Sequence, residues 1–567
     1  RVVYRTGPTR ASGARLGPVA NIDRNLWDRE ITVYGIGGLS GQRSITVNCP
    51  LNFVVPAYLC RAGRIYASVR LWPVEEGPLS ARSAAATGYL QFVDVQAPKV
   101  CLVRVNWVDA AGNVNRPTDA AMLGTLQLAE RMLPFPYFEA TILGTEVTSR
   151  AAFAMAATGG GCNAAWSDLV TDLSVTRIFT ALFQLGSIVY GVVPTAAIPP
   201  SPGPINTGCG RVAGGGFAGF GQTCAHEFGH LYDRPHVAVP GDPANDASYP
   251  NYGGSATSIG EVGIDTGTSP PTLFDPSSSD DIMSYGSNQW ISPYTYQKIL
   301  DARGMHQSVS VDSRRLRPLF VLAFRMYRAG RGAARVELKT AAHVQAAGMA
   351  PPHAAGAVSP VSIDLLDGNR RVLSTHHCRY VAPHGGHDGC GCGGSAVPLE
   401  REPWLDFTEV IEWPGEGVAA IAFHRGEEAL HTIEVGEPPR VAVEGPERRD
   451  NRLVVRVHAS HPRERVSVVV LFSADDGATW QPIAFEPPNG EVIVETDRLP
   501  GGERCRFRAI GTAELQSATA DTDPFELPRA PRRVFIDAPP DTCGIPAGPV
   551  ALAALVDTRG LGPIAPQ

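Results

Sequence analysis

The sequence predicts a multi-domain protein in which one mixed α/β domain is flanked by all-β modules. Its 567 residues exceed what a single hydrophobic core usually organises. Its 60 Gly and 48 Pro indicate many turns between short strands. In one part of the chain strand and helix patterns alternate, which indicates the mixed domain, while strand patterns alone surround it.

The N-terminal half divides into two predicted domains. Residues 1–97 alternate apolar and polar positions between turn signals, which predicts a small β-sandwich. Residues 98–310 are predicted to form the mixed domain. Its expected elements are a strand at 100–108, helices at 118–133 and 166–185, a strand at 187–194 and a closing helix at 294–303. Stretches 198–222 and 237–280 are predicted as long loops, which in a compact domain tend to be functional.

The C-terminal half returns to strand patterns. A β-sandwich is expected over 316–437 and an immunoglobulin-like or fibronectin-like module over 438–530, where Asp475, Asp476 and Gly477 suit a hairpin turn. Residues 531–567 resemble the first strands of a further, incomplete β-module, so we expect the chain to be a fragment of a longer protein.

Charge and hydropathy exclude some partners. The net charge of -7, without a long basic run, argues against a nucleic-acid surface. No apolar stretch reaches the ~18 residues that a bilayer span needs, so no membrane span is expected. The sequence carries no signal of oligomeric state.

The 11 cysteines are scattered and form no pair of CxxC motifs typical of a structural zinc ribbon. This usage suits a secreted, extracellular protein with a few disulfide bonds. Cys49 with Cys60, and Cys162 with either Cys209 or Cys224, are the candidate pairs.

The segment AHEFGHLYDRPHV (225–237) carries the candidate chemistry. Residues four apart share one helix face, so His226 and His230 can present two imidazoles to one metal ion. Glu227 lies beside that ion without binding it. Its expected role is to take a proton from a zinc-bound water and deliver it to the leaving amine.

A third histidine, His236, follows beyond the predicted helix end, because Asp233, Arg234 and Pro235 form a poor helix interior. A turn of the chain there would bring His236 back as a third metal ligand. Three protein ligands and one open position are typical of a catalytic zinc site.

These residues resemble a known family. HEFGHLYDRPH is similar to the metzincin protease signature HExxHxxGxxH, and DIMSYG (281–286) is similar to the methionine turn of those proteases. The resemblance covers roughly residues 98–305 and, more loosely, the C-terminal modules, as in large secreted bacterial members with immunoglobulin-like modules. It implies a metzincin-like catalytic domain and a zinc metalloendopeptidase, a hydrolase of protein or glycoprotein substrates.

The resemblance also assigns individual roles. Met283 would be the methionine beneath the metal, and Tyr285 would bind the metal or stabilise the oxyanion of the tetrahedral intermediate. Asp233 stands where the family has a glycine that lets the backbone turn sharply. Asp tolerates left-handed conformations better than most non-glycine residues, so the turn to His236 is feasible.

Three further segments have alternative interpretations. HHCRYVAPHGGHDGCGC (376–392) is dense enough in His and Cys to bind a second metal, or is a glycine-rich hairpin closed by a disulfide from Cys378 to Cys390 or Cys392. DPSSSDD (275–281) is a candidate Ca²⁺ site, with solvated loop carboxylates as the simpler interpretation. GGGFAGFG (214–221) is interpreted as a flexible edge of the cleft.

A function of another class competes with proteolysis. The protein could be an adhesion or glycan-binding protein whose β-modules act while the protease domain is vestigial. Trp404, Trp413 and Trp480 could contact glycans, although single tryptophans more often fill β-sandwich cores.

Overall fold

The protein is multi-domain and mostly β, as its sequence predicts for the flanking modules. A computed structural model describes residues 2–7, 63–71, 84–154, 162–183, 185–199, 206–210, 212–239, 245–265, 267, 272–286, 288–306, 316–327, 335–346, 357–380, 384–387, 404–415, 417–487, 490–529, 533–537 and 553–557. None of the helices within these ranges is long and apolar enough to cross a bilayer.

The chain forms two compact units. The first comprises residues 1–96, 261–276 and 536–554, and the second comprises 97–260, 277–535 and 555–567. In the first unit, one antiparallel sheet contains β1 (Val2–Gly7), β2 (Gly63–Leu71) and β3 (Ala84–Phe92), and a two-stranded sheet contains β10 (Gly263–Asp265) and β11 (Thr272–Phe274). The β-sandwich expected over 1–97 stays a prediction. Near the C-terminus, β30 (Arg533–Asp537) pairs with β31 (Ala553–Asp557).

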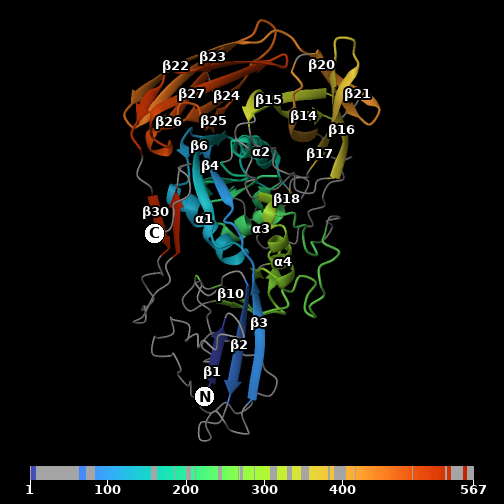
Figure 1. The fold of residues 1–567 in the computed structure, drawn as a ribbon, viewed down its shortest axis with the longest axis vertical. Helices are drawn as coiled ribbons and strands as arrows, with labels where there is room; N and C mark the ends of the chain where they lie inside the picture. The colour runs from blue at the N-terminus through green and yellow to red at the C-terminus, as the bar shows by residue number, and fades with distance from the viewer. Residues whose placement is uncertain are drawn as a thin grey trace. The chain divides into compact units, whose positions relative to one another are not determined.

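A seven-stranded mixed sheet organises the part of the second unit that contains the histidines (Figure 1). Its order from edge to edge is β18 (His384–His387), β8 (Asn206–Gly210), β9 (Gly214–Phe217), β7 (Ile188–Val193), β4 (Lys99–Val108) and β5 (Val114–Asn115), with β6 (Glu139–Ser149) also paired to β4. Three pairs in this sheet are parallel: β4 with β6, β4 with β7, and β7 with β9. The other three pairs are antiparallel: β4 with β5, β8 with β9, and β8 with β18.

Helices cover both faces of this sheet. Along β9, a side chain added at Gly215 would meet Leu169 and Leu173 of α2 (Ala164–Leu182), whereas one added at Gly214 would meet Glu227 of α3 (Gly221–Leu231). Successive residues of a strand point to opposite faces, so α2 and α3 lie on opposite sides of the sheet. α1 (Asp119–Met132) packs against α3.

Three helices of the second unit begin at side-chain caps that are visible in the sequence. Thr118 caps α1, Asn163 caps α2, and Ser292 caps α4 (Pro293–Asp301), each accepting a backbone N–H with its side chain. The other short elements are η3 (Thr195–Ala197), β12 (Asp280–Asp281), β13 (Gln289–Trp290) and η4 (Arg303–His306).

The stretch 198–222 differs from its predicted loop, because it contains β8 and β9 and the first residues of α3. GGGFAGFG is therefore mostly regular structure and not a flexible edge. The strands NTGCG and GGGF are glycine-rich because their backbone lies directly against α3 and β7 side chains: a Cβ at Gly208 would lie 2.4 Å from Thr223, and one at Gly216 would lie 2.3 Å from Tyr190.

Two β-sandwiches follow in the chain. The first has one sheet of β15 (Arg335–Ala346), β14 (Arg317–Tyr327) and β19 (Trp404–Glu412), and one of β17 (Val372–Tyr380), β16 (Ala357–Leu366), β20 (Ala420–Arg425) and β21 (Glu428–Glu434). Phe320, Phe324, Phe407 and Phe423 lie in its core. α2 packs its Phe179 side against both sandwiches and lies next to β15 and β25 (Figure 1).

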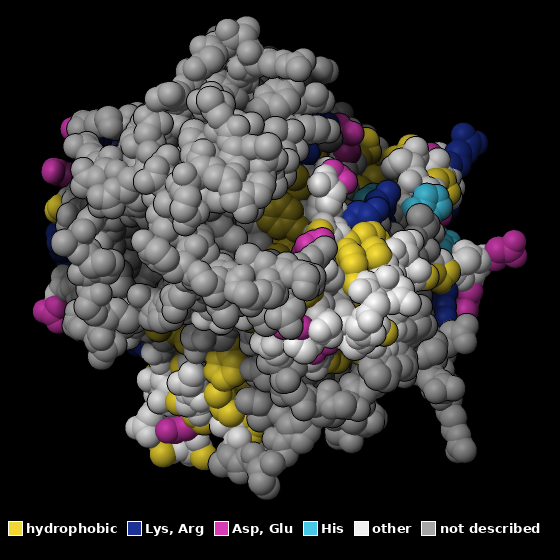
Figure 2. Space-filling view, turned by 90° about the horizontal axis from the view of Figure 1, so that it is seen from below, with side chains coloured by type: hydrophobic (Ala, Val, Ile, Leu, Met, Phe, Trp, Pro, Cys, Tyr) yellow, Lys and Arg dark blue, Asp and Glu magenta, His cyan; other side chains and the backbone are white. Residues whose placement is uncertain are grey.

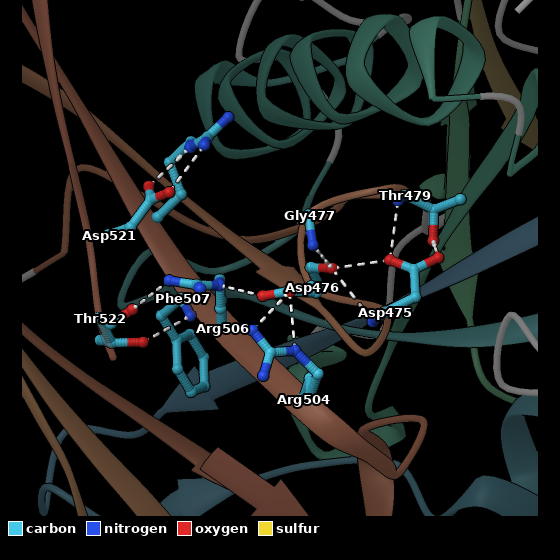
Figure 3. A network of polar contacts seen from close by, with 11 residues as sticks. Asp475, Asp476, Gly477, Thr479, Arg504, Arg506, Phe507, Asp521 and Thr522 are labelled. Atoms are coloured by element: carbon cyan, nitrogen blue, oxygen red, sulfur yellow. Dashed lines mark hydrogen bonds and ion pairs between the residues drawn. The ribbon is translucent and has the colours of Figure 1, made fainter. Parts of the chain in front are cut away.

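The second sandwich has one sheet of β22 (Arg440–Arg449), β23 (Arg452–Ser460) and β26 (Glu491–Glu495), and one of β25 (Gln481–Phe485), β24 (Ser467–Ser473), β27 (Gly502–Ala513) and β28 (Gln516–Asp521), with β29 (Phe525–Leu527) on β27 and η6 (Thr496–Arg498) after β26. β24 and β25 form an antiparallel hairpin. In its turn Asp476 and Gly477 adopt φ of 58° and 90°, and Arg504 and Arg506 both hold Asp476 (Figure 3).

Candidate metal centre

Two imidazoles project from one face of α3. His226 and His230 are four residues apart on the helix, and their Nε2 atoms lie 3.1 Å apart. Both side chains are buried. The helix therefore brings these two nitrogens together as its periodicity predicts.

The chain turns sharply after α3 to return His236 to this position. Asp233 has a φ of 61°, in the left-handed region. The Asp233 N–H donates to the His230 carbonyl at 2.9 Å, and the Arg234 N–H donates to the Gly229 carbonyl at 3.0 Å. These two bonds form a Schellman motif, which normally has glycine where Asp233 stands. The turn places His236 Nε2 3.2 Å from His230 Nε2.

The hydrogen bonds of two imidazoles fix which nitrogen carries the proton. His226 Nδ1 lies 2.7 Å from the Ile282 carbonyl oxygen, and His230 Nδ1 lies 2.7 Å from the Arg234 carbonyl oxygen. A carbonyl oxygen only accepts, so each Nδ1 must donate. In the neutral rings both Nε2 atoms are then acceptors that face each other at 3.1 Å, an arrangement that a shared cation stabilises.

The buried cluster of His226, His230 and His236 could therefore hold a metal ion. The three histidines converge as the sequence predicts, and the binding of a metal by them stays a prediction. Backbone carbonyls that orient the ligand imidazoles are the usual surroundings of such a site, so the residues fit a bound metal ion.

The segment 281–285 packs against α3 and against the chain that follows His236. Met283 is fully buried, and a methyl group added to Gly229 of α3 would lie 2.2 Å from its Sδ atom. The Met283 carbonyl accepts the Val237 N–H at 2.9 Å. Asp281 is also fully buried and accepts the N–H groups of Met283 and Ser292, each at 2.9 Å. One turn thus positions both α3 and the His236 segment.

Tyr285 completes this turn and reaches the histidines. Its half-buried side chain places the phenol oxygen 3.1 Å from His236 Nε2. The phenol can therefore donate a hydrogen bond to a group bound beside that nitrogen.

Glu227 lies on α3 in a cradle of glycine backbone. Its carboxylate is fully buried, and neither oxygen has a hydrogen-bond partner among the described residues. A Cβ at Gly210 would lie 2.0 Å from Oε2, and one at Gly208 would lie 3.5 Å from Oε1. Burial raises the pKa of Glu227 well above its ordinary value. Leaving a buried carboxylate without a hydrogen-bond partner is costly, and this one stands one residue from His226 of the histidine cluster.

Gly208 and Gly210 are parts of this site that the sequence motifs do not indicate. Glycines alternating along NTGCG were the available signal for close backbone approach to a neighbouring side chain. Asp281 belongs both to the candidate Ca²⁺ segment 275–281 and to DIMSYG, and its carboxylate accepts backbone N–H groups. Asp280 likewise accepts from Thr257, so the calcium site stays a prediction.

The cysteines take structural positions. Cys162 and Cys209 form a disulfide, which confirms one of the two predicted partners of Cys162. Cys224 is buried with a free thiol, and burial raises its pKa well above the ordinary value, which suits a packing role. Cys49 and Cys60 lie outside the described residues.

The second His- and Cys-rich segment is spread over two strands and does not form one cluster among the described residues. His376 of β17 contacts Glu409 at 2.8 Å, and Cys378 is buried with a free thiol, so the predicted disulfide from Cys378 is wrong. The thiol lies in the sandwich core, where apolar side chains surround it. Cys390 and Cys392 lie outside the described residues.

The tryptophans considered for glycan contact pack within the modules. Trp413 and Trp480 are buried in hydrophobic cores, and Arg508 stacks on Trp480. Trp404 is half-buried, with the Arg325 guanidinium over its ring. On the face shown in Figure 2, the described Lys and Arg side chains are dispersed among apolar and acidic ones.

Comparison with known proteins gives little further information. The sequence matches no known family model and no curated protein. Among solved structures, a β-1,2-glucanase from Parabacteroides distasonis is similar over 39% of this chain and 30% of its own, with 11% identity and a TM-score of 0.14. The similarity thus spans less than a third of the glucanase chain, and a TM-score this low carries no argument about fold or activity.

Proposed function

We propose that this protein is a secreted zinc-dependent endopeptidase of the metzincin type, acting on protein or glycoprotein substrates. One observation carries the proposal: Glu227, a buried carboxylate with no hydrogen-bond partner in the described part of the chain, stands one residue from His226 in a cluster of three converging imidazoles. Imidazole is a preferred ligand of zinc, and three protein ligands with an open position are typical of hydrolytic zinc sites.

Each residue has a distinct role in this mechanism. Bound zinc would supply Lewis-acid polarisation of the substrate carbonyl. Glu227 takes a proton from the attacking water at its carboxylate and passes it to the amine leaving group. Tyr285 donates its phenol hydrogen to the oxyanion, which its distance of 3.1 Å from His236 Nε2 permits.

The surrounding fold supports this assignment. Antiparallel strand β8 runs beside α3, and its residues Gly208 and Gly210 lie against Glu227, so the general base adjoins a strand of the sheet whose outer side is paired with β18. The Cys162–Cys209 disulfide supports an oxidising compartment, and hence secretion.

The test combines metal analysis with a casein-cleavage assay. Glu227→Ala should retain about one zinc per chain and lose essentially all cleavage, because only the proton carrier is removed. His230→Ala should lose the zinc, whereas His458→Ala, at an exposed histidine, should keep both zinc and activity. Full activity of Glu227→Ala would refute this mechanism. A wild-type protein that neither binds zinc at this site nor cleaves would favour the glycan-binding alternative.

A further inference from the structure

Strand β18 joins the mixed sheet from a distant part of the chain. The other described strands of that sheet lie between Lys99 and Phe217, whereas β18 spans His384–His387 and follows β17 of the first sandwich after three residues. It pairs antiparallel with β8, with His384 opposite Gly210 and Gly386 opposite Gly208. β18 therefore occupies the outer edge of β8.

That edge adjoins the candidate general base. Gly208 and Gly210 are the residues whose backbone lies against the Glu227 carboxylate, and β18 pairs with both of them. β18 also contacts α3, which carries Glu227. The strand consequently lies along the same stretch of β8 that faces the reaction centre.

An extended substrate would use the same backbone groups. A peptide that adds to a sheet edge gains its affinity from main-chain hydrogen bonds, and an edge already paired has none to offer. β18 is His-Gly-Gly-His, and glycine in a strand interior weakens pairing because it loses more conformational freedom. The pairing is therefore suited to being reversible.

We propose that His384–His387 acts as an internal inhibitory strand, which occupies the β8 edge and must leave before a peptide substrate can bind beside Glu227. This inference rests on the proposed peptidase function. It assigns to the first sandwich a regulatory role: any partner or condition that withdraws β18 would activate the enzyme.

The test is a variant that cannot form the β18–β8 ladder. Gly385→Pro combined with Gly386→Pro removes two backbone N–H groups and disfavours the strand. The matched control is Gly368→Pro, in the turn between β16 and β17 of the same module, where an added side chain meets no atom within 4 Å. Zinc content, kcat/KM for a fluorogenic peptide and amide hydrogen exchange of residues 206–210 are measured on the full chain.

The double variant should show faster exchange in β8, unchanged zinc content and a higher kcat/KM than the wild type or the control. If β18 occupies the edge in about nine of ten molecules, the rise is about tenfold. Adding Glu227→Ala should abolish the gained activity. A synthetic peptide of residues 383–388 added in excess should inhibit the double variant.

Contrary outcomes separate the inference from the proposed function. If the double variant shows faster exchange in β8 but cleaves at the wild-type rate, the inhibitory role is overturned and the peptidase function stands. The same conclusion follows if exchange in β8 is equal in the wild type, the double variant and the control. Faster exchange with zinc bound and no cleavage by any form refutes the peptidase and the inference together. If the proline variant unfolds, a deletion of residues 384–387 tests the same expectation by the same measurements.

Discussion

A methyl group on Gly229 would lie 2.2 Å from Met283 Sδ, so α3 and the 281–285 turn are in contact at a position where any added side chain must displace the buried Met283 side chain. Gly229→Ala should therefore displace the turn and lower the free energy of unfolding by about 1–3 kcal/mol. Zinc affinity should fall with it, because the Ile282 carbonyl that orients His226 belongs to the same turn. Thermal unfolding and zinc titration check this.

The control for that variant is the same substitution in an open helical position. Gly124 lies in α1, and an added methyl group meets no atom within 4 Å. Gly124→Ala should stabilise the protein by about 0.5–1 kcal/mol, because alanine loses less backbone entropy in a helix. Equal effects of both alanines would contradict the steric argument.

The left-handed conformation of Asp233 predicts how substitutions there change stability and zinc binding. A β-branched residue is strongly disfavoured at a φ of 61°, so Asp233→Val should lose about 1–2 kcal/mol of stability and weaken zinc binding. Asp233→Gly should keep wild-type zinc binding, since glycine adopts this conformation freely. Zinc stoichiometry and urea unfolding of the two variants decide the matter. Intact zinc affinity in Asp233→Val would show that His236 does not depend on this turn.

Substitutions at Tyr285 and at His236 should have different effects on catalysis and on zinc binding. Tyr285→Phe should keep bound zinc yet reduce kcat by about 100- to 1,000-fold, the usual effect of losing one oxyanion donor. His236→Ala should instead lose zinc affinity. Loss of zinc from Tyr285→Phe would mean that the phenol is needed to hold the metal.

Zinc should also stabilise the folded protein. At zinc concentrations 100-fold above its Kd, the free energy of unfolding rises by about 2.7 kcal/mol, because the converged histidines exist only in the folded state. A chelator should reverse the shift in wild type and have no effect on His226→Ala. Calorimetry with and without chelator measures it. Equal shifts in both proteins would place the stabilising metal elsewhere.

His306 should make the protein acid-sensitive. Its Nε2–H donates to the Leu231 carbonyl at 2.8 Å, and burial lowers its pKa from 6.5 to about 3. Between these values the unfolded chain binds a proton that the folded chain does not, so stability falls as pH drops from about 6.5 towards 3. Above pH 6.5 His306 is neutral in both the folded and the unfolded chain, so the protein keeps its full stability with respect to this group.

Urea unfolding at pH 7.5 and pH 4.5 tests this dependence. His306→Gln should reduce the difference in stability between the two pH values, because glutamine does not titrate. His458→Gln, at an exposed position, should leave the difference unchanged. A wild-type pH dependence in His306→Gln would assign the acid sensitivity to other groups.

The sequence predicted best those features that depend on local spacing. The four-residue interval between His226 and His230 suffices to place both on one face of α3. Helices near 118–133 and 166–185 were likewise predictable, because helix-forming residues and N-terminal caps act locally. The strands β8 and β9 were not, since glycine-rich segments carry no strand signal of their own.

By itself, the sequence determined the chemical identity of the candidate site: two histidines and a glutamate on a helix, a third histidine after a turn, and the Met283 and Tyr285 pattern. Only the tertiary structure decided that Asp233 takes the left-handed conformation, that Gly208 and Gly210 lie against Glu227, and that His384–His387 pairs with β8. The physical reason is that helix geometry follows from neighbouring residues, whereas close backbone approach and strand pairing depend on residues far apart in the chain.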